Sequence, residues 1–208
     1  MRNPDAYVEL DVVEGEFWWM NYLSGISFDG EEFRIPYIKT LTDTGATCTY
    51  LPNPVFKAVL NRIRSAAKLT LWKGDYYMDC ADIWKLPVIE FLYGGYWLEF
   101  SPEDYMVEDD GVSGSCFLCI LKETESPNEA LLGNGFLRGF YSTHDLETNK
   151  FGFAPHATSN KADPRPGELP KIWLEGTNRR VKVIVWAVVI SSLAAISIGL
   201  AIYICASS

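Results

Sequence analysis

The feature that most constrains the fold is a succession of short apolar and aromatic runs separated by turn residues. The clearest case is Gly94-Gly95, which stands between the runs 86–93 and 96–100. Two such runs on either side of a two-glycine turn indicate a β-hairpin. Comparable runs occur at 7–13, 17–28, 35–41, 116–121, 136–143 and 150–154. The pattern predicts a mostly β domain.

One segment departs from the β pattern and predicts a helix. Asn53 is a suitable N-cap, and Pro54 suits the first position of a helix. The apolar residues that follow recur at helical spacing. They are Val55, Phe56, Val59, Leu60 and Ile63. We expect a packed surface helix here.

Length and charge limit what the domain can do. Residues 1–157 suffice for one domain with its own core, but not for two good-sized domains. Acidic side chains outnumber basic ones by 27 to 18, and the net charge of the chain is −9. Such a field repels a phosphate backbone, so we expect no nucleic-acid partner.

The C-terminal part of the chain has a different composition. Residues 158–180 are rich in proline, glycine and polar groups, which predicts a linker or stalk. Residues 183–205 contain no charged side chain and are long enough to cross a bilayer as a helix. We therefore predict a transmembrane helix within 181–205, which would make the chain a single-pass membrane protein.

The cysteines and histidines do not predict a metal site. There are five cysteines, at positions 48, 80, 116, 119 and 205, and only two histidines. A single Cys-x-x-Cys spacing, Cys116 to Cys119, falls short of a zinc ligand set. No motif indicates a cofactor. Because the cysteine count is odd, at least one thiol is free, and Cys205 at the membrane end is the natural candidate.

The motif that carries chemistry is Asp43-Thr44-Gly45, which follows an expected strand at 37–42. Taken alone, these three residues could form a tight turn with a capping carboxylate. Their context is more specific. Leu51-Pro52 and the expected helix follow, and Leu131-Leu132-Gly133 comes later in the chain.

In this order the motifs resemble those of the C-terminal lobe of pepsin-like aspartic peptidases. The resemblance covers about residues 17–156, and it implies a single lobe of the bilobal pepsin-like acid protease fold, spanning 1–157. The motifs that carry it are Gly25-Ile26-Ser27, Asp29-Gly30, Asp43-Thr44-Gly45, Leu51-Pro52, Pro87-Val-Ile-Glu-Phe91, the run 96–102, Gly114-Ser115-Cys116, Leu131-Leu132-Gly133 and the segment 149–153.

The resemblance implies a role for each residue of the motif. Asp43 would be a catalytic carboxylate of an aspartic-type endopeptidase, which needs no cofactor. Thr44, Gly45, Leu132 and Gly133 would support the loop, Thr44 through its hydroxyl and Gly133 by letting a strand pass close beneath. Leu131 and Leu132 would anchor that strand in the core. Gly45, Ala46 and Thr47 would contact an extended peptide substrate.

Two positions depart from the usual pattern of such a lobe. Ala46 stands where Ser or Thr usually bonds the outer oxygen of the aspartate, and dimeric retroviral peptidases have alanine there. Asn134 stands where many relatives have aspartate. Both changes alter the polar groups expected around the Asp43 carboxylate.

The chain contains one Asp-Thr-Gly, whereas the family's chemistry needs two. Two nearby carboxylates share a proton and hold the attacking water, because like charges push their pKa values apart. We therefore expect the isolated chain to be inactive. Three hypotheses follow: the chain is a fragment that lacks its N-terminal lobe, it forms a retropepsin-like homodimer through a second protomer, or it is an inert binding lobe.

The resemblance also implies a disulfide between Cys80 and Cys116, while Cys48 and Cys119 either pair or remain reduced. A disulfide favours a lumenal or extracellular domain, in the secretory or endolysosomal system. The basic residues Arg179, Arg180 and Lys182 would by themselves favour a cytosolic domain. We prefer the first orientation. A glycolipid-anchor signal near 176–178 ranks lower, because its polar spacer is short.

Overall fold

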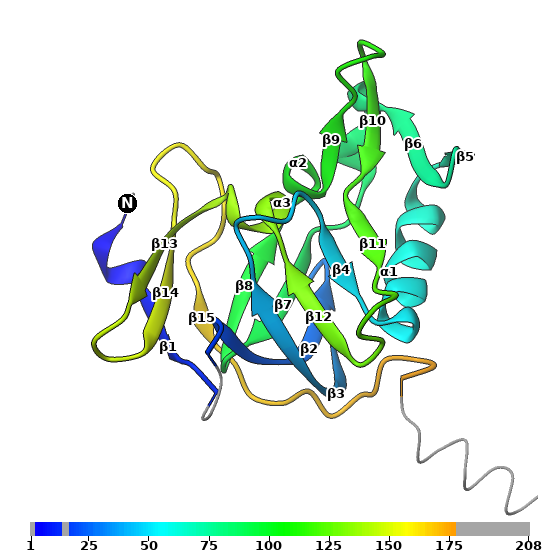
Figure 1. Cartoon of the computed structure of the whole chain (residues 1–208). Helices are drawn as coiled ribbons and strands as arrows, with labels where there is room; N and C mark the ends of the chain where they lie inside the picture. Colours follow the sequence, from blue (N-terminus) through cyan, green and yellow to red (C-terminus); the bar gives the residue numbers. More distant parts are fainter. Residues whose placement is uncertain (1–2, 14–16, 178–208) are drawn as a thin grey trace, which may run out of the picture.

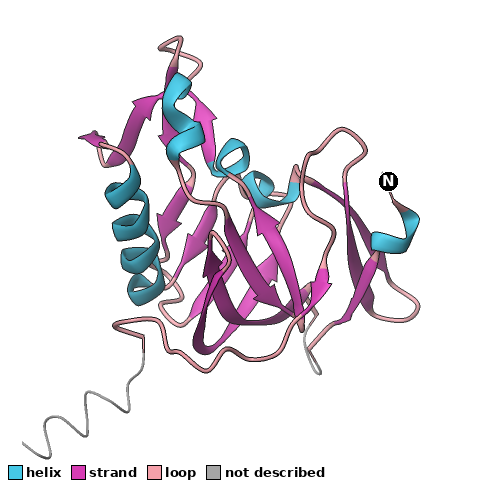
Figure 2. Ribbon diagram, turned by 180° about the vertical axis from the view of Figure 1, so that it is seen from behind, coloured by secondary structure: helices cyan, strands magenta, loops and turns pink. Residues whose placement is uncertain are grey.

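A computed structural model describes residues 3–13 and 17–177, in which most regular structure is β-strand (Figure 1; Figure 2). The mostly β prediction is confirmed. The helices are η1 Pro4–Ala6, α1 Asn53–Ala66, η2 Cys80–Lys85, α2 Pro102–Tyr105 and α3 Asn134–Leu137. The strands are β1 Val8–Asp11, β2 Met20–Phe28, β3 Glu31–Thr42, β4 Thr49–Leu51, β5 Thr70–Trp72, β6 Asp75–Asp79, β7 Ile89–Tyr93, β8 Tyr96–Phe100, β9 Met106–Glu108, β10 Ser115–Leu118, β11 Ile120–Lys122, β12 Glu129–Leu132, β13 Phe140–Asp145, β14 Lys150–Pro155 and β15 Arg165–Pro166.

These strands form three sheets. The largest has eight strands in the order β11-β4-β12-β3-β2-β7-β8-β15. A four-stranded sheet, β5-β6-β10-β9, extends from one end of the molecule, and a three-stranded sheet, β1-β14-β13, lies at one side (Figure 1). The predicted hairpin is present as β7 and β8, which pair from Ile89–Phe100 to Tyr93–Tyr96.

A cluster of buried aromatic rings joins the large sheet to the three-stranded sheet. Tyr93 of β7 lies 6.0 Å from Phe151 and 6.3 Å from Phe153 of β14, between ring centroids. Phe136 of α3 contacts Phe153 and Phe100 in the same cluster. Because each ring buries a large apolar area, this cluster stabilises the packing between the two sheets.

Strand β3 changes register near Pro36. Leu23 of β2 pairs with Ile38, whereas Gly25 pairs with Arg34, so β3 carries extra residues between the two pairs. Proline cannot donate a hydrogen bond to a neighbouring strand, and such an irregularity bends the strand. Gly25 of β2 leaves room for the side chains beside this irregularity, because a Cβ there would lie 3.0 Å from both Leu92 and Trp97.

The predicted helix is present as α1, but its first turn differs from the expectation. The N-cap is Pro52, and Asn53 is the first helical residue rather than the cap. The Pro52 carbonyl accepts the first helical hydrogen bond, from the Phe56 N–H at 2.9 Å. Proline holds φ of Pro52 at −52°, and the helix has no side-chain cap hydrogen bond.

Other boundaries also differ from the predicted ones. The run 136–143 was expected to be one strand, but 134–137 is the helix α3 and the strand begins at Phe140. The Gly133 carbonyl accepts hydrogen bonds from both Phe136 and Leu137, which closes a helical turn there. The run 116–121 is divided at Cys119 into β10 and β11, which belong to different sheets. Strands β5 and β6 were not predicted.

Residues 158–177, which we call the strap, lie along the domain, although the sequence predicts a linker at 158–180. The strap contributes β15, which pairs with β8. Farther along, the Leu174 N–H donates to the Arg34 carbonyl at 2.9 Å, and the Arg34 N–H donates to the Ile172 carbonyl at 2.6 Å. Arg165 forms ion pairs with Glu32 and Glu90. These contacts hold the strap against the large sheet.

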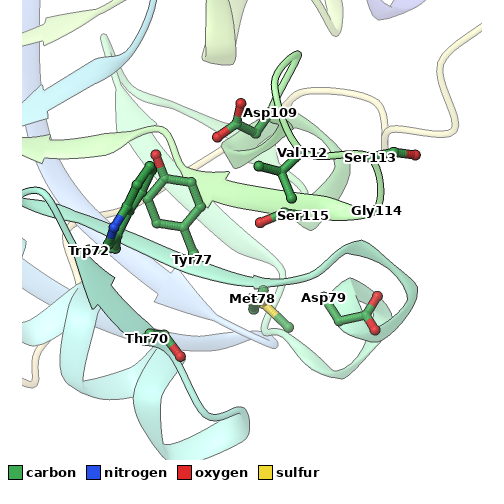
Figure 3. Close-up of a pocket in the computed structure, with 10 residues that line it drawn as sticks. All are labelled: Thr70, Trp72, Tyr77, Met78, Asp79, Asp109, Val112, Ser113, Gly114 and Ser115. Carbon is green, nitrogen blue, oxygen red and sulfur yellow. The ribbon is translucent and has the colours of Figure 1, made fainter.

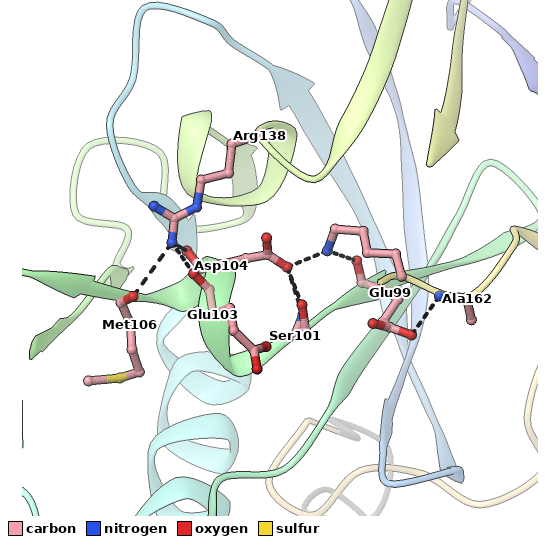
Figure 4. A network of polar contacts seen from close by, with 8 residues as sticks. Glu99, Ser101, Glu103, Asp104, Met106, Arg138 and Ala162 are labelled. Carbon is pink, nitrogen blue, oxygen red and sulfur yellow. Dashed lines mark hydrogen bonds and ion pairs between the residues drawn. The ribbon is translucent and has the colours of Figure 1, made fainter. Parts of the chain in front are cut away.

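A buried ion pair fixes the beginning of the strap. The Lys161 ammonium contacts the Asp104 carboxylate and donates to the Glu99 carbonyl at 2.8 Å. Asp104 also accepts from the Ser101 hydroxyl at 2.6 Å, and Arg138 donates to the Asp104 carbonyl (Figure 4). Burial lowers the pKa of Lys161, and the Asp104 charge opposes that shift.

The predicted transmembrane segment, 183–205, lies outside the described residues. Within 3–13 and 17–177, no helix is both long enough and apolar enough to span a bilayer.

Replacing Asp104 by asparagine should destabilise the protein markedly. Asp104→Asn leaves the Lys161 ammonium buried without its counter-ion, and breaking a buried pair in this way costs about 3–5 kcal/mol. Urea unfolding of the full chain in detergent, followed by tryptophan fluorescence, measures the loss. The control is Lys85→Met, which removes the exposed pair with Asp82 and should cost about 0–1 kcal/mol. Equal losses in the two variants would contradict this account of the strap.

Candidate active site

Asp43 lies directly after β3, at the start of a loop that leads into β4. Its N–H donates to the Leu132 carbonyl at 3.0 Å. Its carboxylate is partly exposed, and one oxygen, Oδ1, accepts from the Gly45 N–H at 2.8 Å. Because Oδ1 accepts this hydrogen bond from the backbone N–H two residues later in the chain, the bond orients the carboxylate at the surface.

The loop is closed from below by the end of β12. This strand runs parallel to β3, with Leu132 opposite Thr42, and Leu131 pairs with Tyr50 of β4 on its other side. A Cβ at Gly133 would lie 2.3 Å from the Cys48 carbonyl oxygen and 2.7 Å from that of Ala46. Only glycine permits this approach of one backbone to another.

Backbone hydrogen bonds fasten the two chain segments together at this crossing. The Asn134 N–H donates to the Ala46 carbonyl at 2.8 Å, and the Gly135 N–H donates to the Thr47 carbonyl at 2.9 Å. The Asn134 side chain adds a third contact, because its Nδ2 donates to the Thr44 carbonyl at 2.9 Å. The departure from aspartate at position 134 therefore supplies a donor that holds the loop.

The expected support residues differ in exposure. The Thr44 side chain is exposed, and the Thr44 carbonyl accepts the contact from Asn134 of the neighbouring segment. Leu132 is fully buried as expected, whereas Leu131 is partly exposed. Leu132 alone of the pair anchors β12 in the core.

A buried tyrosine supports β3 just before the loop. The Tyr93 hydroxyl donates to the Thr40 carbonyl at 3.0 Å and lies 3.1 Å from the Thr42 hydroxyl. Burial raises the pKa of Tyr93, so the phenol stays protonated and keeps its donor. The sequence analysis missed this residue, since a tyrosine in an apolar strand carries no local signal for such a role.

Two disulfides are present, and one of them lies at the loop. Cys80 and Cys116 are bonded, as the resemblance implies, and join η2 to β10. Cys48 and Cys119, whose pairing the sequence left open, are also bonded. Cys48 follows Thr47 directly, and the Thr49 N–H donates to the Cys119 carbonyl at 3.0 Å. This second bond ties the end of the Asp43 loop to the start of β11.

The expected substrate-contacting residues form the outer surface of the loop. Gly45 and Thr47 are exposed, and Ala46 is partly exposed. A separate cavity of about 460 Å³ lies between β5, β6 and the loop 109–115, where Trp72, Tyr77 and Asp109 are among its lining residues (Figure 3). It does not include residues 43–47.

Asp43 forms no ion pair within the described part of the chain. No group of three or more His, Cys, Asp or Glu side chains among residues 3–13 and 17–177 could hold a metal ion.

His144 of β13 lies away from this loop. The centroid of its ring is 4.9 Å from that of Trp19, and burial lowers the pKa of His144. Asp145 caps the following turn instead of contacting that histidine.

The sequence of the chain is similar to those of known proteins. Residues 5–156 match the family described as "Eukaryotic aspartyl protease". The chain is 30% identical to a vacuolar aspartic protease of Candida albicans over 142 residues, which cover 66% of this chain and 32% of the relative. It is 29% identical to pepsin A of Sus scrofa over 146 residues, which cover 70% and 37%. The chain therefore spans about a third of the length of these relatives.

Gly133→Ala should disrupt the loop that carries Asp43. The new methyl group would overlap the carbonyl oxygens of Cys48 and Ala46, and the Ala46 oxygen cannot move away without breaking its hydrogen bond from the Asn134 N–H. We expect a loss of at least about 1–3 kcal/mol in urea unfolding. The matched control is Gly111→Ala on an exposed loop, where the only near neighbour of a Cβ is an Asp109 side-chain oxygen at 3.2 Å. An unchanged unfolding midpoint for Gly133→Ala would disprove the crowding argument.

Proposed function

Because the chain belongs to the eukaryotic aspartyl protease family, we propose that it is the C-terminal lobe of a pepsin-like endopeptidase. In this proposal Asp43 is one of two catalytic carboxylates. The second is supplied by an N-terminal lobe, so that this chain alone does not hydrolyse peptides. The substrate is an extended peptide that lies between the two lobes and contacts Gly45, Ala46 and Thr47.

The observation that supports this proposal is the way the Asp43 carboxylate is presented. It is partly exposed, it is oriented by the Gly45 N–H, and it stands on a loop that β12 and Asn134 hold rigidly. A carboxylate used only to cap a turn needs no strand threaded beneath it. A rigid, solvent-facing carboxylate is what water activation requires.

The chemistry follows from pairing this carboxylate with another. When two carboxylates lie close together, mutual repulsion separates their pKa values, so that one is ionised while the other keeps its proton. The ionised group takes a proton from a bound water as the water adds to the peptide carbonyl. The protonated group gives its proton to the carbonyl oxygen. Because one carboxyl must stay protonated, acidic pH favours the reaction.

The source of the second carboxylate has two candidates. The first is an N-terminal lobe, which accords with the chain covering about a third of each relative. The second is another copy of this chain, which Ala46 favours because dimeric retroviral peptidases have alanine at this position. A third possibility, an inert binding lobe, predicts no cleavage with either partner.

The relatives and the disulfides indicate a lumenal or extracellular domain in the secretory pathway. Disulfides persist in such oxidising compartments and are rare in the cytosol. We propose in addition that residues 183–205 anchor the domain to a membrane as a single helix. The charge-free composition of that segment supports the anchor.

Fusing the N-terminal half of pepsin A from Sus scrofa to this full chain tests the proposal. The fusion should cleave a peptide substrate at acidic pH, whereas the chain alone should not. Asp43→Asn should lower kcat of the fusion by about 10²–10⁴-fold or more, because the residue loses its proton-transfer role. The matched control is Asp109→Asn, a partly exposed carboxylate that lies away from the Asp43 loop, which should leave kcat unchanged.

The alternatives give different results in the same experiment. Cleavage by the chain alone, together with a dimer in analytical ultracentrifugation and loss of activity in Asp43→Asn, would assign the second carboxylate to another protomer. A folded fusion that binds a peptide but never cleaves it would indicate an inert lobe. Full activity of Asp43→Asn would exclude Asp43 from catalysis altogether.

A further inference from the structure

The domain has two distinct ends along β3. The Asp43 loop follows the last residue of β3, whereas the strap crosses the strand near Arg34, at the opposite end of the large sheet (Figure 1). Asp43 is six positions after Tyr37, so the two ends lie about 20 Å apart at about 3.3 Å per strand residue. We call the strap end the base and define it by Tyr37, Lys171, Ile172, Trp173 and Thr177.

The base exposes large apolar side chains that the domain itself does not cover. Ile172 is 65% exposed and Tyr37 is 59% exposed, while Trp173 is 36% exposed. The Arg34 guanidinium lies over the Trp173 ring, with Cζ 4.9 Å from the centroid, and Lys171 is exposed beside it. Tyrosine, tryptophan and long basic side chains are the residues that suit a membrane–water interface.

A cavity of about 650 Å³ opens among these side chains. Its walls are largely aromatic rings and prolines, and Arg34 supplies a positive charge. The Nε atom of Arg34 is buried and has no hydrogen-bond partner within the described part of the chain. A partly exposed arginine that lines an apolar cavity matches a phospholipid headgroup, whose phosphate accepts from arginine and whose glycerol and acyl groups are apolar. The lining residues are Arg34, Pro36, Tyr37, Ile38, Pro52, Pro54, Val55, Pro127, Asn128, Trp173 and Thr177.

The position of the proposed anchor brings this end of the domain to the bilayer. The strap is described as far as Thr177, and the charge-free segment begins at Val183, so five residues, 178–182, connect them. Fully extended, the six residue-to-residue steps from Thr177 to Val183 span at most about 20–22 Å. The headgroup layer itself takes up about 5–8 Å of that length. Thr177, which lines the cavity, therefore stays within about 12–17 Å of the lipid surface.

We infer that the base rests on the phospholipid surface, with Ile172 and Trp173 in the headgroup layer and Arg34 on a lipid phosphate. This inference rests on the proposed membrane anchor and adds an orientation to it. The Asp43 loop then faces away from the bilayer, about 20 Å above it. The substrates accessible to such a site are peptide segments that stand clear of the membrane, not segments embedded in it.

Fluorine NMR of the full chain in phosphatidylcholine nanodiscs tests the inference. The seven tryptophans are replaced by 5-fluorotryptophan, and Trp173→Phe and Trp84→Phe assign two of the resonances. Trp84 is the matched control, since it is 74% exposed on η2, which packs against α2 and β9, away from the base. A nitroxide-labelled lipid should broaden the Trp173 resonance but not that of Trp84. An aqueous gadolinium chelate should do the reverse.

A variant separates contact from mere proximity. Ile172→Glu places a carboxylate in the proposed headgroup contact, while the Ile172 carbonyl that binds Arg34 remains. The chain should stay in the nanodisc, but the lipid-induced broadening of Trp173 should be lost and the gadolinium effect should appear. Val112→Glu, at an exposed apolar residue away from the base, should change neither effect.

Each other outcome overturns the inference in a recognisable way. If gadolinium broadens Trp173 as strongly as Trp84, the base stands free in water. If Trp173 is shielded from both probes, a second copy of the chain covers the base in place of lipid. If the chain does not incorporate into nanodiscs, the anchor fails and the orientation fails with it. None of these results depends on peptide cleavage, so the endopeptidase proposal is tested separately.

Discussion

The candidate site depends on one close contact between two backbone segments. Gly133 passes so near the carbonyls of Ala46 and Cys48 that no side chain fits between them. From this crossing, hydrogen bonds fix both sides of the Asp43 loop, and Asn134 adds a side-chain donor. The Cys48–Cys119 disulfide closes the same loop covalently. The Asp43 carboxylate is exposed without being free to move, which is the condition for aligning a water molecule.

The strap extends this organisation beyond the part of the chain that matches the family. The family match ends at residue 156, yet Lys161 is buried against Asp104, and the strap continues across the large sheet to Thr177. It thereby brings the C-terminal end of the described chain to the side of the domain opposite Asp43. A membrane anchor attached there would hold the proposed cleft away from the lipid, whereas a loose stalk would leave its orientation undefined.

Sequence reasoning succeeded where local pattern and local structure agree. The glycine pair at 94–95 predicts the β7–β8 hairpin, and the helical spacing after Pro54 predicts α1, because turn chemistry and periodicity are local properties. It failed where distant contacts decide. Phe136 belongs to a helical turn because Gly133 is already fixed beneath the loop, and the polar composition of the strap gave no indication that Lys161 finds Asp104. Tyr93 was read only as a strand residue.

The sequence by itself determined the β class, the single Asp-Thr-Gly and the charge-free segment at 183–205, since each is a matter of composition or short-range order. From the single Asp-Thr-Gly we expect that hydrolysis would need a second carboxylate from outside this chain. Only the tertiary structure decided that Asn134 supports the loop through Thr44, that Cys48 pairs with Cys119, and that the strap returns to the base. These contacts join residues many positions apart, and their energies depend on a geometry that no local pattern specifies.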